Sequence, residues 1–93
     1  MKDLIATVRE YSNKIINDRE PVDIFEALRD EVEELDAEMY GYSQGEDGIA
    51  GEAIDVINCA LDLIFKANPE WTNDDIVAYA EKKCQKWLEK NSG

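Results

Sequence analysis

Apolar residues recur at helical spacing along most of this chain, and no other feature restricts its fold as strongly. Near the amino end, Leu4, Val8, Tyr11 and Ile15 follow one another at steps of three and four residues, as one face of a helix requires. No segment shows the alternation of apolar and polar residues that is typical of a half-buried strand. Both prolines fall at joints between the periodic stretches. The pattern therefore predicts an all-α fold built from four helices.

Prolines, glycines and capping residues set the expected helix boundaries. The four helices are expected over residues 2–17, 22–40, 49–67 and 73–90. Pro21 suits the first turn of the second helix, and Thr72 with Asp75 indicates a capping box at the start of the fourth. Three glycines within residues 41–48 predict a loop, because each costs a helix about 1 kcal/mol. The whole chain, 1–93, is expected to be one domain, whose small core would gain from burial against a second copy.

The charge of the chain excludes several classes of function. There are 22 acidic and 10 basic residues, which give a formal net charge of −12. Such an excess disfavours binding to nucleic acid or to an anionic membrane surface. The absence of histidine removes the usual zinc ligand and the usual general base. Cys59 and Cys84 form no CxxC pair, which favours reduced, packed thiols in a cytoplasmic protein, and no apolar run is long enough for a transmembrane segment.

The third expected helix combines an apolar composition with acidic residues. Twelve of the seventeen residues from 49 to 65 are apolar, and they surround the helix axis, so this helix is expected to be central and the most buried. Glu52, Asp55, Cys59 and Asp62 nevertheless project from one side of it. Carboxylates in a core-like helix are costly unless something neutralises them.

The second expected helix supplies a matching set of acids. Glu31 and Glu34, together with Glu38, lie along the edge of its apolar stripe, where they can face a neighbouring helix. Three other acids point away from that edge and are expected to be solvated: Glu26, Asp30 and Glu33. For Glu38 and Asp62 an ordinary surface role stays open.

A lack of basic residues sets this acidic region apart. Residues 30–65 contain eleven acids and no Lys or Arg, so no i,i+4 ion pairs soften the repulsion. The countercharge must come from outside the segment. Carboxylate ligands without histidine or thiolate select a hard cation, so the sequence predicts a site for Mg²⁺, with Mn²⁺ as the alternative.

These motifs resemble a known family. Glu31-x-x-Glu34, a glycine-rich spacer and Glu52-x-x-Asp55 together resemble the metal-binding signature of the MazG-like all-α nucleoside triphosphate pyrophosphohydrolases, with Asp30 in the place of a leading Glu. The resemblance extends from the region of Leu28 to the region of Trp87. It implies a four-helix protomer whose bundle is completed by homo-oligomerisation, as a dimer or a tetramer. It also implies that the two acidic pairs are the catalytic and Mg²⁺-binding residues for hydrolysis of a (deoxy)nucleoside triphosphate to the monophosphate and pyrophosphate.

The same family places basic residues late in the fourth helix, where they contact phosphate. Here the resemblance assigns that role to Lys83 first and to Lys86 second, because Lys83 lies closest to the apolar seam that runs from Ile76 to Trp87. The chain departs from the commoner pattern, in which an Asn follows the Lys by one turn, since Trp87 occupies that place.

Two other functions remain compatible with the sequence. An acidic helical module could bind a basic protein surface by charge mimicry, or the chain could bind nucleotide as a sensor without hydrolysing it. Three aromatic residues beside loops, Tyr40, Tyr42 and Trp71, are candidates for stacking on a base but more commonly serve in packing. The sequence leaves open the preferred base and sugar and which carboxylate accepts a proton.

Overall fold

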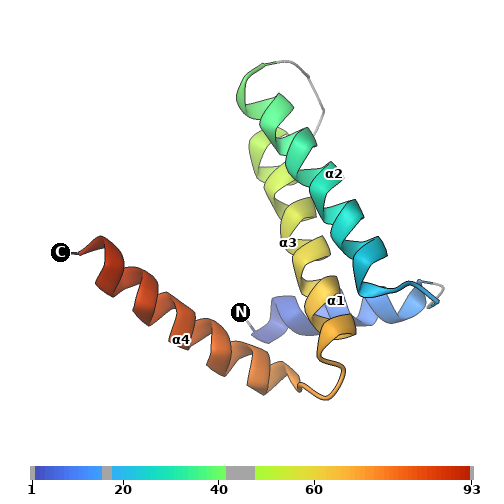
Figure 1. Ribbon diagram of the computed structural model, residues 1–93, viewed down its shortest axis with the longest axis vertical. Helices are drawn as coiled ribbons and strands as arrows, with labels where there is room; N and C mark the ends of the chain where they lie inside the picture. Colours follow the sequence, from blue (N-terminus) through green and yellow to red (C-terminus); the bar gives the residue numbers. More distant parts are fainter. Residues whose placement is uncertain (1, 16–17, 42–47, 93) are drawn as a thin grey trace.

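The computed structural model describes residues 2–15, 18–41 and 48–92, and over these ranges it contains four helices and no strand. The helices are α1 (Lys2–Lys14), α2 (Pro21–Met39), α3 (Gly48–Ala67) and α4 (Asn73–Asn91). Helices α2 and α3 lie side by side as an antiparallel hairpin, α1 crosses one end of it, and α4 leads away (Figure 1). The predicted all-α fold class is confirmed. No helix in the described ranges has the length and apolar character needed to span a membrane.

The predicted helix boundaries hold to within one residue, except at the end of α1. That helix ends at Lys14, three residues before the expected end, because the chain closes into a tight turn in which the Ile15 amide donates to the Ser12 carbonyl at 3.2 Å. Residues 16 and 17 lie outside the described residues. The predicted loop is flanked by Gly41 and Gly48, whose φ angles of +75° and +66° suit glycine, and 42–47 lie outside the described part of the chain.

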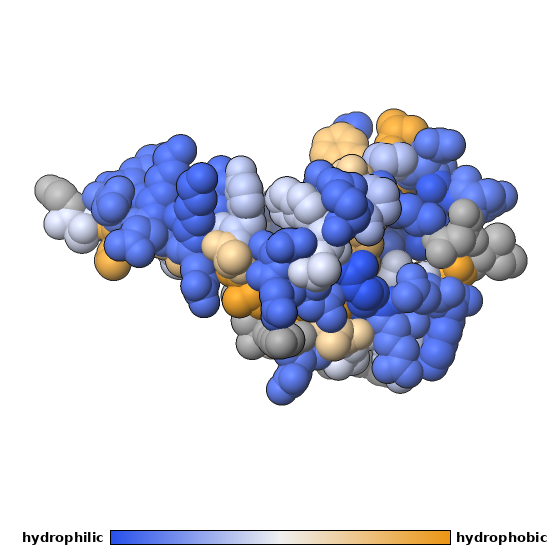
Figure 2. Space-filling view, turned by 90° about the horizontal axis from the view of Figure 1, so that it is seen from below, coloured by the Kyte–Doolittle hydropathy of each residue, from blue (hydrophilic) through white to orange (hydrophobic). Residues whose placement is uncertain are grey.

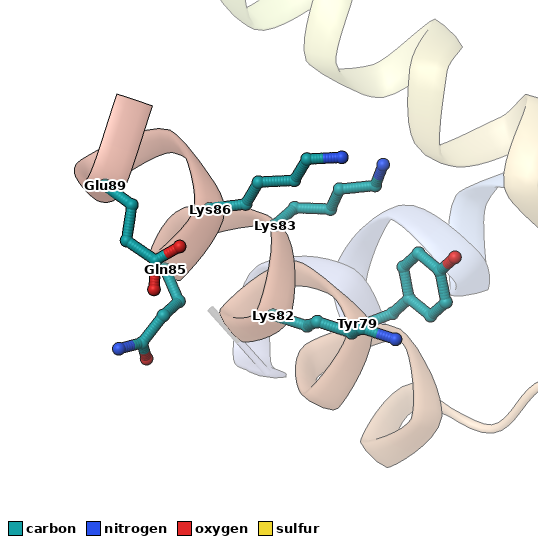
Figure 3. Close-up of a pocket in the computed structure, with 6 residues that line it drawn as sticks. All are labelled: Tyr79, Lys82, Lys83, Gln85, Lys86 and Glu89. Atoms are coloured by element: carbon teal, nitrogen blue, oxygen red, sulfur yellow. The ribbon is translucent and has the colours of Figure 1, made fainter. Parts of the chain in front are cut away.

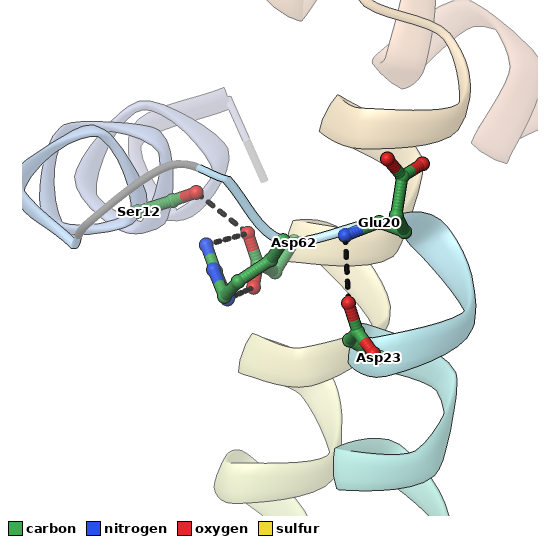
Figure 4. A network of polar contacts seen from close by, with 5 residues as sticks. Ser12, Glu20, Asp23 and Asp62 are labelled. Carbon is green, nitrogen blue, oxygen red and sulfur yellow. Dashed lines mark hydrogen bonds and ion pairs between the residues drawn. The ribbon is translucent and has the colours of Figure 1, made fainter.

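Side chains cap the starts of two helices. At α4 the Asp75 amide donates to the Thr72 hydroxyl at 3.1 Å, and the Thr72 amide donates to the Asp75 carboxylate at 2.8 Å. This reciprocal pair is the predicted capping box. At α2 the Glu20 amide donates to the Asp23 carboxylate at 2.9 Å (Figure 4). Pro21 occupies the first helical position, where its missing N–H costs no intrahelical bond.

A small core forms where α1, α3 and α4 meet. Its buried members form one cluster: Ile5, Leu61, Phe65 and Ile76. The Arg9 guanidinium lies over the Phe65 ring, 4.2 Å from its centroid, and also donates to the Asn73 side chain at 2.7 Å and to the Trp71 carbonyl at 3.2 Å. Arg9 on α1 therefore fastens the beginning of α4 to the rest of the molecule.

The chain leaves much apolar surface uncovered. The prediction that the third helix is the most buried holds for its second half only, since Ile49, Ile54 and Ile57 in its first half are 41–51% exposed. The physical reason is that α2 covers only one side of this part of α3. The radius of gyration is 14.8 Å, against about 12 Å for a compact domain of this length.

Two further expected apolar faces are only half covered. On α2, Leu28 and Leu35 are partly buried, whereas Phe25, Val32 and Met39 are exposed. On α4 the predicted seam is buried at Ile76 and partly buried at Ala80, but its later members, Cys84 and Trp87, are exposed. Packing of Cys84 was therefore wrongly predicted for the single chain, because α4 leaves the other helices beyond its first turns. Figure 2 shows α4 as an arm beside the main body.

Candidate metal centre

Four carboxylates from two helices converge on one point of the α2–α3 hairpin. Glu31 and Glu34 stand one turn apart on α2, and Glu52 and Asp55 stand one turn apart on α3. One carboxylate oxygen from each lies within 4.8 Å of one from every other. These are the four residues that the sequence singles out as metal ligands, and the hairpin brings all of them together.

The cluster is partly shielded from solvent. Glu31, Glu52 and Asp55 are partly buried, whereas Glu34 is exposed. One oxygen of Glu31 is fully buried and accepts no hydrogen bond in the described structure. A buried carboxylate oxygen without a donor is costly, so this oxygen needs a proton or a cation.

Electrostatics within the cluster favour protonation of Glu31 when no cation is bound. The pKa of Glu31 is raised from its ordinary value of 4.5 to about 7. Burial is the largest cause, and a hydrogen bond with Glu34 and the charges of Glu34, Asp55 and Glu52 contribute to the same total. Four negative charges in so small a space are mutually repulsive. A divalent cation among them would reverse the sign of that interaction.

The donor set fits a hard divalent cation. All four side chains offer oxygen, and together they offer more than one ligand atom from each helix. Mg²⁺ and Mn²⁺ prefer carboxylate oxygen and water, whereas zinc sites in proteins usually contain histidine or thiolate. The buried Glu31 oxygen without a hydrogen-bond donor is the observation that most directly supports a cation site here.

Cys59 lies one turn beyond Asp55 on α3 and does not extend the donor set. Burial raises the pKa of its thiol, and the charges of Glu31, Asp62 and Asp55 raise it further. The thiol therefore stays protonated at neutral pH and is neither a thiolate ligand nor an activated nucleophile. Both cysteines are free, as the sequence predicts.

Asp62 is a structural residue. It is only 8% exposed, and its carboxylate accepts a hydrogen bond from the Ser12 hydroxyl at 2.6 Å (Figure 4). The Arg19 guanidinium donates to both carboxylate oxygens, at 2.6 and 3.3 Å. Residue spacing leaves Asp62 open as a surface acid and predicts no role for Arg19. The sequence does indicate such a partner, because an acid in a segment without bases needs a countercharge from outside that segment.

The remaining acids of α2 separate as expected. The three acids that were predicted to be solvated are exposed: Glu26, Asp30 and Glu33. They lie with Arg29 around a shallow surface depression on the side of α2 away from the cluster. Glu38 is partly buried and is not a member of the cluster.

The two candidate phosphate-binding lysines lie apart from the four carboxylates. Lys83 and Lys86 are exposed on α4, and Figure 3 shows their side chains extending in the same direction. Helix α4 makes no close backbone approach to α2 or α3 in the described structure. A single chain therefore does not bring these lysines to the acidic cluster.

An apolar groove opens beside the cluster. It has a volume of about 550 Å³ and is formed by α1, α2 and α3. Its lining includes Tyr11, Ile15, Ile54 and Cys59, the last of which lies one turn beyond Asp55. Of the aromatic residues considered for base stacking, Trp71 packs against Tyr79 with ring centroids 5.2 Å apart. Tyr40 is exposed at the end of α2, and Tyr42 lies outside the described residues.

The fold and the site together define an all-α chain with a four-carboxylate centre on a helical hairpin. Comparisons of the chain with known protein families, with curated proteins and with solved structures found no match. The function is therefore inferred from the geometry and chemistry of the site.

Proposed function

We propose that this chain is a Mg²⁺-dependent nucleoside triphosphate pyrophosphohydrolase of the MazG-like type, with Mn²⁺ as an alternative cation. The proposal rests on the convergence of Glu31, Glu34, Glu52 and Asp55, with ligand oxygens within 4.8 Å of one another. Their pairing as ExxE on one helix and ExxD on the next is the pattern that resembles this family.

The four carboxylates would hold the cation, and they would do little to bind a triphosphate without it. A bound divalent ion supplies positive charge that offsets the phosphates and lowers the pKa of a water near the α-phosphorus. The oxygen of that water would bond to the α-phosphorus, and a carboxylate only partly engaged by the ion would accept the proton that the water loses. The bond from the α-phosphorus to the bridging oxygen then breaks, and pyrophosphate leaves.

The apolar groove supports a nucleotide as the substrate. Its lining includes Cys59, one turn from Asp55, so a ligand with its phosphates at the cluster would extend its apolar part into the groove. Apolar walls with a few polar groups are typical of sites for flat aromatic ligands. Asn58 in the groove wall offers an amide for hydrogen bonding to a base edge.

The uncovered apolar surface supports a homo-oligomer. Phe25, Val32 and Met39 recur at steps of seven along α2 and are 48–55% exposed. On α3, Ile49 and Ile57 lie eight residues apart and are also exposed. Helical periodicity places both sets on the side of the hairpin opposite the acidic cluster. A second copy of the chain packed on this face would complete a four-helix bundle and leave the acidic side open to substrate.

The decisive experiment is a substrate panel. The protein is incubated with each ribo- and deoxyribonucleoside triphosphate and Mg²⁺, and the products are resolved by chromatography. Monophosphate and pyrophosphate are the expected products, and phosphate release would indicate a different reaction. Glu34→Gln and Asp55→Asn should abolish hydrolysis, whereas Glu33→Gln, which changes an exposed acid on the opposite side of α2, should retain it.

The same panel separates the alternatives. A nucleotide sensor would bind nucleotide in the presence of Mg²⁺ and release no product. An acidic interaction module would bind a basic protein in a salt-dependent and metal-independent way. The partial burial of three cluster carboxylates disfavours charge mimicry, because a mimic displays its charges on an exposed face.

A further inference from the structure

The apolar groove follows the α2–α3 hairpin away from the acidic cluster. On α3 its lining includes Cys59 and Asp62, one and two turns beyond Asp55. On α2 it includes Ala27, one turn before Glu31. Asp62 lies about 10 Å along α3 from Asp55, which is close to the distance from the α-phosphorus of a nucleotide to the far edge of its base. A nucleotide with its phosphates at the cluster would therefore bring that edge of the base near Asp62.

Three polar side chains of the groove lining meet at this point: Ser12, Arg19 and Asp62. The Asp62 carboxylate accepts a hydrogen bond from the Ser12 hydroxyl at 2.6 Å (Figure 4). It also accepts from the two Nη atoms of Arg19, at 2.6 and 3.3 Å. Nearer the start of α1, the Thr7 hydroxyl donates to the Asp3 carbonyl at 2.8 Å. The Ser and Thr hydroxyls of the lining are therefore already engaged as donors.

Arg19 keeps one donor that nothing in the described structure uses. Its Nε atom is buried and has no hydrogen-bond partner. Both bonds to Asp62 come from the Nη atoms, so the edge of the guanidinium that carries Nε stays free. Arg19 lines the groove, and a quarter of its side chain is exposed. Because a buried N–H group without an acceptor is costly, a ligand that supplies an acceptor atom here would be favoured.

Asp62 is less suited than Arg19 to recognise a ligand. Its carboxylate is 8% exposed, already accepts hydrogen bonds from Ser12 and Arg19, and has its charge balanced by the guanidinium. The group without a partner at this point is thus a donor, and the matching ligand atom is an acceptor. Bases differ in this respect at C4 of a pyrimidine and at C6 of a purine, where some carry a carbonyl oxygen and others an amino group.

Resting on the proposed function, we infer that Arg19 selects nucleotides whose base carries a carbonyl group at this position, by donating its Nε hydrogen to the carbonyl oxygen. Uracil, thymine, guanine and hypoxanthine have this carbonyl group, whereas cytosine and adenine carry an amino group in its place. An amino group would set a second donor against the buried donor of Arg19 and leave it unpaired, which lowers affinity. Arg19 is then a specificity residue, and the chemistry stays at the four carboxylates.

Matched pairs of substrates test this selection in the wild-type protein. Inosine triphosphate is compared with adenosine triphosphate, and uridine triphosphate with cytidine triphosphate, each as the ribonucleotide and as the 2′-deoxyribonucleotide. In the presence of Mg²⁺ the member with the carbonyl group should have a kcat/KM higher by about tenfold or more in both pairs. Equal values within a pair would overturn the inference. A preference for the amino member would also overturn it and would identify Asp62 as the group that reads the base.

The variant Arg19→Lys assigns the selection to the guanidinium. Lysine keeps a positive charge beside Asp62 but lacks the planar edge that carries Nε, so the preference within each pair should fall to about twofold or less. Arg29→Lys makes the same exchange at an exposed site on α2 and should keep the wild-type preference. A purely structural Arg19 would affect both members of a pair equally, so an unchanged ratio in Arg19→Lys would contradict the assignment. If this variant fails to fold in urea titrations, the wild-type comparison still decides.

Binding of analogues tests the same contact without relying on hydrolysis. The α,β-methylene analogues of the four ribonucleotides, which lack the bond to be broken, are titrated into the protein with Mg²⁺ in a calorimeter. The analogues with the carbonyl group should bind with a Kd lower by about tenfold or more. If the wild-type protein hydrolyses no nucleotide, the proposed function fails, while these affinities still decide the role of Arg19. Equal affinities within the pairs, or no binding of any analogue, would overturn the inference.

Discussion

The carboxylates of the cluster differ in their exposure to water and in their hydrogen bonding. Glu34 is exposed and can face water, whereas Glu31 has one oxygen that is buried and accepts no hydrogen bond. In the metal-free protein the pKa of Glu31 is therefore about 7, well above the 4.5 of a free side chain. A proton and a divalent cation are alternative ways to neutralise this oxygen, so the two should compete.

The raised pKa of Glu31 predicts that the metal-free protein loses stability as pH rises. Between about pH 4.5 and 7 the unfolded chain releases this proton while the folded chain keeps it, so the stabilisation is complete below 4.5 and lost through 7. Urea unfolding in a chelator at pH 5 and pH 8 should show a decline of the order of 1–2 kcal/mol that Glu31→Gln removes. Glu33→Gln should keep it. An unchanged decline in Glu31→Gln would contradict the assignment.

The ion pair between Arg19 and Asp62 predicts that removing its cation costs much more stability than removing the cation of an exposed pair. Arg19→Ala leaves the buried Asp62 without its cation and should lower the free energy of unfolding by about 3 kcal/mol. Lys14→Ala removes the exposed Lys14–Glu10 pair and should change it by less than about 0.5 kcal/mol. Both values come from urea denaturation monitored by circular dichroism. Similar small losses would show that Asp62 is solvated in the protein.

At the scale of helices, features set by the local sequence were predictable, whereas contacts between distant segments were not. The helices, the capping box at Thr72 and the facing of Glu31 toward Glu52 follow from residue spacing within a helix or between chain neighbours. The ion pair between Asp62 and Arg19 and the path of α4 depend on contacts between distant segments, such as the hydrogen bond from Arg9 to Asn73. Spacing carries no information on these contacts, which explains why the apolar seam of α4 was expected to be covered.

The capping box gives a prediction for α4. Thr72→Ala removes the hydroxyl that accepts from the Asp75 amide and should lower the free energy of unfolding by about 1 kcal/mol. Thr72→Asn restores an acceptor and should recover most of that loss. The measurement is thermal and urea unfolding of the three proteins. If alanine and asparagine behave alike at position 72, the cap contributes no stability to α4.

For the molecule as a whole, one side of the hairpin is acidic and the opposite side is apolar. The acidic side gathers carboxylates that repel one another in the absence of a cation, and the apolar side exposes Phe25, Val32 and Met39. Few of the side chains that the structure describes are fully buried, so covering the apolar side would add substantially to the stability of the chain. Oligomerisation and cation binding then stabilise the same hairpin from its two sides.

This arrangement predicts that the oligomer depends on the exposed stripe of α2. Val32→Lys would place a charge in the apolar contact and should weaken self-association by about tenfold or more, because burying an unpaired ammonium group is costly. Asp30→Lys adds a lysine to the solvated side of the same helix and should leave association intact. Sedimentation equilibrium over a range of concentrations measures both. If the contact lies at Val32, the stability of the wild-type protein should also rise with protein concentration. Dissociation by Asp30→Lys but not by Val32→Lys would place the contact on the other side of α2.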